Sequence, residues 1–154
     1  MQMIDSRTQK LNGEQIIEIA AKNTKVDRPV AQVKEMLTVE FNMPNTWKMR
    51  EGNTIFLCHK SQQPGYGYFR ALNADTAQNF LQNSRVFADA AYKVGFDVLV
   101  TQFQDSSLLG LFKMISRNPV REGMGYAAKK TAGDGYQVTL VLGPARGGSN
   151  GRSN

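Results

Sequence analysis

Residues 66–103 read YGYFRALNADTAQNFLQNSRVFADAAYKVGFDVLVTQF and contain a strand, a long helix and a second strand. The stretch from Tyr66 to Leu72 is typical of a strand, and apolar residues then recur at helical spacing. Gly95 predicts the end of that helix, and the apolar run from Val98 predicts a strand covered on both faces. A helical crossover joins parallel strands, so we expect these two strands to be parallel in one sheet.

Further elements are expected on both sides of this unit. They are a helix over 13–22, a helix with Pro29 at its N1 position running to about Leu37, a loop over 42–53, a hairpin over 54–72, the long helix capped by Asp75 or Asn73, a strand over 98–103, a helix over 106–117, and strands over 124–130 and 136–142 joined by the turn Gly133-Asp134-Gly135. The order α-α-β-β-α-β-α-β-β predicts an α/β fold (α+β, with a mixed sheet), one central parallel pair and helices on both faces.

Composition limits the classes of function. The chain has 154 residues, enough for one ordinary domain, and no apolar run reaches the roughly 18–20 residues of a membrane span. The first helical stretch carries Glu14, Glu18 and Lys22, which argues against a signal peptide. Nineteen Lys and Arg against thirteen Asp and Glu give a net charge of +6, which favours contact with a polyanion.

A single cysteine, Cys58, and a single histidine, His59, exclude an intramolecular disulfide, a cysteine zinc cage and most hydrolase mechanisms. They also favour a reducing, intracellular setting. We expect a flexible N-terminal arm over 1–12, one domain over 13–144 and a flexible, basic Gly/Ser-rich tail over 145–154.

The element order resembles the fold of the GNAT family of N-acetyltransferases over about residues 13–143, most clearly over 96–142. The helix over 106–117 and the hairpin ending in Leu142-Gly143-Pro144 also resemble a smaller group of phage proteins with this fold. That group includes internal virion proteins of podophages and uncharacterised proteins of marine phages. The resemblance implies a GNAT-like domain and a phage setting.

GNAT enzymes hold the pyrophosphate of acyl-CoA on backbone N–H groups at a helix N-terminus, in the motif Gln/Arg-x-x-Gly-x-Gly/Ala. Arg70 fits the first motif position, but neither glycine is present. Asp75 instead predicts a carboxylate that caps the helix and repels a phosphate. If acyl-CoA binds at all, the residues that the resemblance implies are Arg70, Leu72, Asn73, Ala74, Asp75, Thr76 and Ala77.

Many GNAT enzymes protonate the leaving thiolate with a tyrosine in the pattern Asn-x-x-Ala-x-x-x-Tyr-x-x-x-Gly-Phe. Laying Asp105 on the asparagine puts Phe112 on the tyrosine, and phenylalanine has no proton to give. No general base can be assigned, because Glu40 and Glu51 are expected to be solvated surface groups. The sequence therefore predicts no catalytic residue.

Other candidate sites have structural interpretations. Cys58 and His59 are neighbours in a strand, so their side chains point to opposite faces. The repeats Gly65-Tyr66-Gly67-Tyr68 and Gly123-Met124-Gly125-Tyr126 open no helix and are expected to be hairpin and strand-edge glycines. A set of strand aromatics and basic residues is expected mainly to pack in the sheet, with stacking on single-stranded nucleic acid as the alternative. Its members are Tyr66, Tyr68, Phe69, Arg70, Tyr126, Lys129 and Lys130.

Three functions remain open. The first is a non-catalytic, GNAT-like phage protein without cofactor or metal, a structural or assembly component of the virion. Its expected partners are other phage proteins or further copies of itself, in the host cytoplasm or the virion and not at a membrane. The second is a divergent N-acyltransferase using acetyl-CoA. The third is a basic module that binds nucleic acid or a host protein, with weak polyanion contacts at Lys129, Lys130, Arg146 and Arg152.

Overall fold

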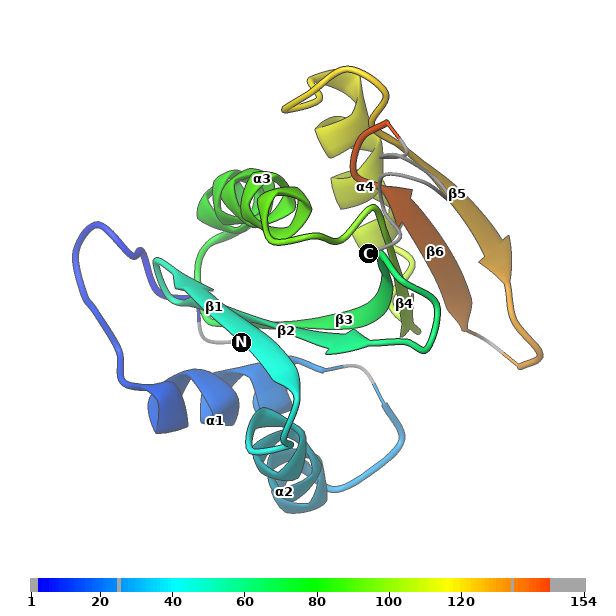
Figure 1. The fold of residues 1–154 in the computed structure, drawn as a ribbon. Helices are drawn as coiled ribbons and strands as arrows, with labels where there is room; N and C mark the ends of the chain where they lie inside the picture. Colours follow the sequence, from blue (N-terminus) through cyan, green and yellow to red (C-terminus); the bar gives the residue numbers. More distant parts are fainter. Residues whose placement is uncertain (1–2, 25, 134, 145–154) are drawn as a thin grey trace. The chain divides into compact units, whose positions relative to one another are not determined.

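A computed structural model describes residues 3–24, 26–133 and 135–144 (Figure 1). The helices are α1 (Gly13–Asn23), α2 (Val30–Phe41), α3 (Ala77–Lys93) and α4 (Leu108–Arg117). The strands are β1 (Thr46–Glu51), β2 (Thr54–Lys60), β3 (Tyr66–Asn73), β4 (Val98–Phe103), β5 (Gly125–Lys130) and β6 (Tyr136–Val141). They form a six-stranded sheet in the order β1-β2-β3-β4-β6-β5, so the predicted mixed α/β fold is confirmed.

The central parallel pair is β3 and β4. Its register places Tyr66 opposite Val98 and Tyr68 opposite Val100, and both strands continue beyond the three paired positions. Strand β4 also pairs antiparallel with β6, which in turn pairs with β5. Strand β6, the last in the described part of the chain, is therefore inserted between β4 and β5.

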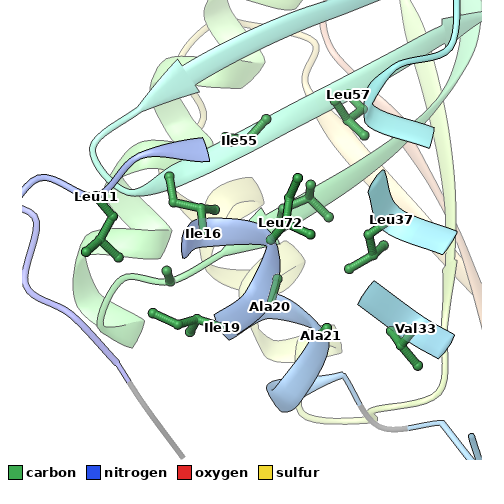
Figure 2. Packing of buried hydrophobic residues seen from close by; sticks show 12 residues of the cluster. Leu11, Ile16, Ile19, Ala20, Ala21, Val33, Leu37, Ile55, Leu57 and Leu72 are labelled. Atoms are coloured by element: carbon green, nitrogen blue, oxygen red, sulfur yellow. The ribbon is translucent and has the colours of Figure 1, made fainter. Parts of the chain in front are cut away.

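The chain divides into two compact units. Unit 1 comprises Met1–Cys58 and Arg70–Asn83, and unit 2 comprises His59–Phe69 and Ser84–Asn154. In unit 1, α1 and α2 pack on the face of β2 that carries Ile55 and Leu57 (Figure 2). The side chain of Asn83, in the first half of α3, donates to Thr54 Oγ on the other face of β2. Helices therefore cover both faces of this strand, as predicted.

Unit 2 has its own core between α4 and the sheet. Val138 and Leu140 of β6 and Leu99 of β4 are buried, as are Phe112 and Ile115 on one face of α4. Helix α4 packs against β5. The alternation of buried and half-exposed residues in β6 agrees with the sequence pattern.

The end of α3 has the predicted geometry. Gly95 has φ +121°, and its N–H donates to Tyr92 O while the N–H of Phe96 donates to Ala91 O. These two bonds are those of a Schellman motif, and Phe96 is buried as its hydrophobic partner.

Residues 46–51, which the sequence predicts as loop, form β1, so the observed order has one strand more than expected. The prediction failed because this strand carries Lys48, Arg50 and Glu51 and lacks a clean apolar alternation. Helix α2 is longer than predicted: Pro29 occupies its N-cap position, not N1, and the helix continues to Phe41.

Strand β4 also differs from its prediction. Leu99 is fully buried, but Val98 and Val100 on the opposite face are only partly buried. The apolar run therefore does not indicate a strand covered on both faces. Helix α4 starts at Leu108, two residues later than predicted. Asp105 and Ser106 lie in the turn before it.

Candidate functional site

The connection between β3 and α3 is the place where the resemblance implies a pyrophosphate would bind. Two of its backbone N–H groups, and one in the first turn of α3, have acceptors within the chain. The N–H of Ala74 donates to Asn53 O (3.0 Å), and that of Asp75 donates to Asn73 Oδ1 (3.0 Å). One turn later, the N–H of Asn79 donates to Thr76 Oγ (3.2 Å). These three amides would have to break internal bonds to hold a phosphate.

Thr76 is therefore the residue that caps α3, and the prediction that Asp75 or Asn73 caps it is wrong. The carboxylate of Asp75 is fully buried. Its Oδ2 accepts from the N–H of Asn53 (2.8 Å) and from Nδ2 of Asn83 (2.7 Å). Its Oδ1 has no hydrogen-bond partner among the described residues.

Asn53 joins this buried network to the N-terminal segment. Its Oδ1 accepts from the N–H of Leu11 (2.9 Å) and from Arg50 Nη2 (2.8 Å), and its Nδ2 donates to Gln9 O (2.7 Å). The N–H of Ile4 donates to Ala74 O (2.7 Å), so residues near the N-terminus lie directly against the β3–α3 connection.

Asp5 adds a second carboxylate at this place. Its Oδ1 accepts from Nδ2 of Asn79 in the first turn of α3 (2.8 Å), and its side chain pairs with Arg7 (2.9 Å). Hydrogen bonds from Arg7 hold the pKa of Asp5 well below its usual range, so the carboxylate stays charged. Asp5 and Asp75 together disfavour a pyrophosphate at the start of α3.

Other residues of the implied cofactor set also have structural roles. The guanidinium of Arg70 is 2.6 Å from the carboxylate of Glu40 in α2. Glu40 is only 18% exposed, so it is a paired residue and not the solvated surface group that the sequence predicts. Leu72 is buried in the core of unit 1, whereas Ala77 is exposed at the first position of α3.

In unit 2, Phe112 is the centre of a group of rings that we call the aromatic cluster. Its ring centroid lies 6.3 Å from that of Phe69 in β3 and 6.0 Å from that of Phe103 in β4. The remaining members are Phe87, Tyr126 and Tyr136. Phe112 is almost fully buried among aromatic rings, and its own side chain offers packing and no exchangeable proton.

Cys58 and His59 do not form a reactive pair in this fold. Cys58 is fully buried, and burial raises the pKa of its thiol, whereas His59 is only partly buried. Among the described residues, no group of three or more His, Cys, Asp or Glu side chains is arranged to hold a metal ion.

The glycine repeats lie where hairpin and strand geometry requires them. Gly65 and Gly123 have positive φ angles in turns, and Gly67 is buried in β3. A Cβ at Gly67 would lie 2.8 Å from the ring of Phe96, so the position has a packing reason to be glycine. Neither repeat begins a helix.

The candidate polyanion contacts divide into two groups. Lys129 and Lys130 are exposed at the end of β5, and Lys130 Nζ lies 5.9 Å from the centre of the Tyr136 ring. Arg146 and Arg152 lie outside the described residues. Within the described part of the chain, no helix combines the length and apolar character that a membrane crossing needs.

Sequence reasoning missed Asn53 and Asn83, which build the buried network with Asp75, and Asp5, which bonds Asn79 at the start of α3. One signal was present: Gly52-Asn53 is a two-residue hairpin turn sequence directly before the strand that was predicted from residue 54. Recognising it would have indicated β1, and with it the position of Asn53 beside the end of β3.

No protein-family model matches the chain, and no curated protein sequence matches it. Among solved structures, the ribosomal-protein-S18-alanine N-acetyltransferase from Escherichia coli is similar with a TM-score of 0.55 and 9% sequence identity, covering 89% of this chain and 94% of that chain. The acetyltransferase of GNAT family from Streptococcus pneumoniae gives a TM-score of 0.49 at 9% identity, covering 91% and 97%. The first likeness shows the fold alone: this chain has a GNAT-like fold.

Proposed function

We propose that this chain is a non-catalytic GNAT-like protein, a structural or interaction component whose acyl-carrier site has been converted into internal packing. The observation that carries the proposal is the β3–α3 connection. The N–H groups of Ala74 and Asp75 in this connection donate to acceptors of the chain itself, as does that of Asn79 in the first turn of α3, and the Asp75 carboxylate is buried. A pyrophosphate would therefore have to displace satisfied bonds in a negatively charged setting.

The aromatic cluster supports the same proposal from unit 2. Phe112 stands where the resemblance implies a tyrosine that donates a proton, and both Phe69 and Phe103 contact its ring. A hydroxyl at this buried position would need a hydrogen-bond partner, and the rings of Phe69 and Phe103 supply none. The position is therefore better suited to holding α4 on the sheet than to proton transfer.

A narrower form of the proposal places the protein in a phage particle or its assembly, with other virion proteins or further copies of itself as partners. It rests only on the likeness of residues 106–144 to phage proteins of this fold. Copurification of the chain with mature particles, against its absence from them, distinguishes the narrower form from a general interaction module.

The second candidate is a divergent N-acyltransferase. The specific observation in its favour is the fold itself, since the similar Escherichia coli structure is named as an N-acetyltransferase and is covered over 94% of its length. Backbone N–H groups bind phosphate whatever side chains surround them, so missing motif glycines alone do not exclude acyl-CoA.

Calorimetry of the full chain with coenzyme A separates the two candidates. We expect no heat of binding up to low millimolar ligand, whereas micromolar affinity would overturn the non-catalytic proposal. Release of free thiol from acetyl-CoA, measured with a thiol reagent, is the matching activity assay, because the protein's own Cys58 is buried and silent in the folded state.

The variant Phe112→Tyr makes the comparison sharper. It restores the hydroxyl of the implied proton donor but adds no group that would bind acyl-CoA. We expect it to release no thiol above the rate of the parent chain. Measurable acetyl transfer by Phe112→Tyr would instead favour the divergent enzyme.

A further inference from the structure

The four strands of unit 2 present two unlike faces. On the covered face, which packs against α4, Leu99, Val138 and Leu140 are buried. On the other face, no residue of Tyr66–Phe69, β4, β5 or β6 is buried. We call this second side the open face and define it by Tyr66, Tyr68, Val98, Val100, Ala127 and Lys129.

The strand register shows that these residues share one side. Tyr68 lies opposite Val100, Val100 opposite Thr139, and Thr139 opposite Ala127. Directly opposed residues point to the same face of a sheet, so this row runs across all four strands. At strand spacings of about 4.8 Å, the row is about 14 Å long.

The open face is unusually aromatic for a solvated one. Tyr66 is 39% exposed and Tyr68 is 57% exposed, and their neighbours on β4 are valines. An antiparallel sheet commonly has a wet face, but that face is usually polar. By contrast, Phe69 and Tyr126 on the covered side belong to the aromatic cluster, so packing explains them and leaves Tyr66 and Tyr68 unexplained.

The net charge of unit 2 indicates which kind of partner the open face binds. Unit 2 has ten Lys and Arg against five Asp and Glu, a net charge of +5, so it carries nearly all of the chain's +6. A second copy of the chain would bring the same positive charge to the face. A polyanion with flat, unstacked rings matches both the tyrosines and Lys129, and single-stranded nucleic acid has this chemistry.

We propose that the open face binds single-stranded nucleic acid, with bases stacked on Tyr66 and Tyr68 and the phosphate backbone drawn to Lys129. This proposal goes beyond the function proposed above and does not depend on whether acyl-CoA binds. Base contacts by stacking tolerate any sequence, so we expect little sequence preference and a strong dependence on salt.

Fluorescence anisotropy of the full chain with a labelled oligothymidylate tests the proposal. We expect binding that weakens as salt rises and that is stronger than binding to a duplex of the same length. The double variant Tyr66→Leu/Tyr68→Leu should lose about tenfold or more in affinity, since each stacked base contributes substantially. The matched control is Tyr126→Leu, which changes a tyrosine of similar exposure on the covered side and should bind like the parent chain.

Several results would overturn the proposal. These are no binding in low salt, equal affinity for duplex, an unchanged affinity in the double variant, or an equal loss in Tyr126→Leu. Sedimentation that shows a dimer lost in the double variant would assign the open face to self-association instead. The calorimetric test with coenzyme A reads a different ligand, so failure of one proposal is seen separately from failure of the other.

Discussion

Asp75 lies just before α3, but its side chain does not cap that helix. A carboxylate at the start of a helix ordinarily accepts from the helix N–H groups. Here Thr76 takes that role, and Asp75 instead joins β2 to α3 through Asn53 and Asn83. The sequence predicts that Asp75 repels a phosphate at the start of α3. In the structure its carboxylate stabilises the β3–α3 connection through buried hydrogen bonds.

Replacing Asp75 by alanine should lower the free energy of unfolding by about 2 kcal/mol, because the buried N–H of Asn53 loses its acceptor. Asp75→Asn should cost less, since an amide oxygen can still accept that bond. Urea denaturation measures both. Asp27→Ala, at an exposed position, is the control and should stay close to the parent. Equal stability of Asp75→Ala and Asp27→Ala would contradict the role of the network.

Cys58 provides a residue-scale prediction with a defined sign. Burial raises the pKa of its thiol above the ordinary value of 9.0, so the folded state keeps the neutral form while the unfolded state ionises. The contribution of Cys58 to stability should therefore be present at neutral pH and decline as pH rises above about 9. Denaturation of the parent and of Cys58→Ala across this range should show a difference that shrinks with pH. A constant difference would argue against it.

At the scale of elements, the β1–β2 hairpin depends on its turn. Gly52 has φ +58°, and a Cβ there would lie 2.7 Å from Asp75 Oδ2. The turn therefore has both a conformational and a packing requirement for glycine, and together these hold the hairpin against the buried network.

The variant Gly52→Ala should lower the free energy of unfolding by about 2 kcal/mol or more, since strain at positive φ adds to the contact with Asp75. Gly133→Ala is a matched control, because Gly133 also has positive φ (+88°) but a Cβ there meets no atom within 4 Å. It should cost only the strain, about 1 kcal/mol. Thermal or urea unfolding compares the two, and an equal cost would show that contact with the network contributes nothing.

At the scale of the whole molecule, the chain has a GNAT-like fold, while the two glycines and the tyrosine that the resemblance implies are replaced by Asn73, Asp75 and Phe112. Fold and chemistry separate in this way because the sheet and its helices are stabilised by buried apolar area, whereas catalysis depends on a few polar positions. Two further features of this chain are the Asp5 carboxylate, which bonds Asn79 at the start of α3, and the open face of unit 2.

The stability of the whole chain should also respond to acid through Asp5. Its pKa is lowered from the ordinary 3.8, mainly by Arg7, so the stabilisation it gives is present above that pH and is lost as pH falls below it. Asp5→Asn should therefore lower the urea midpoint at neutral pH, with a difference that narrows in acid. Asp27→Asn serves as the control for a general effect of charge. A difference that stays the same in acid would contradict the pairing with Arg7.

The amino-acid sequence by itself determined the elements whose signals are local. Helical periodicity, Gly95 and the run from Val98 were enough to predict α3, its C-terminal cap and β4, and so the central parallel pair. The absence of motif glycines and the phenylalanine at position 112 were also readable directly, because they concern residue identity and not placement.

Only the tertiary structure decided where polar groups find their partners and which faces stay open. Asn53 lies 22 residues before Asp75 in the chain, and the buried hydrogen bonds that join Asn53, Asp75 and Asn83 leave no periodic trace in the sequence. Tyr68 and Tyr126 likewise look alike in the sequence, yet one faces solvent and the other contacts Phe112. The physical reason is that burial and hydrogen bonding depend on contacts between distant segments, whereas helix and strand preferences depend on neighbours.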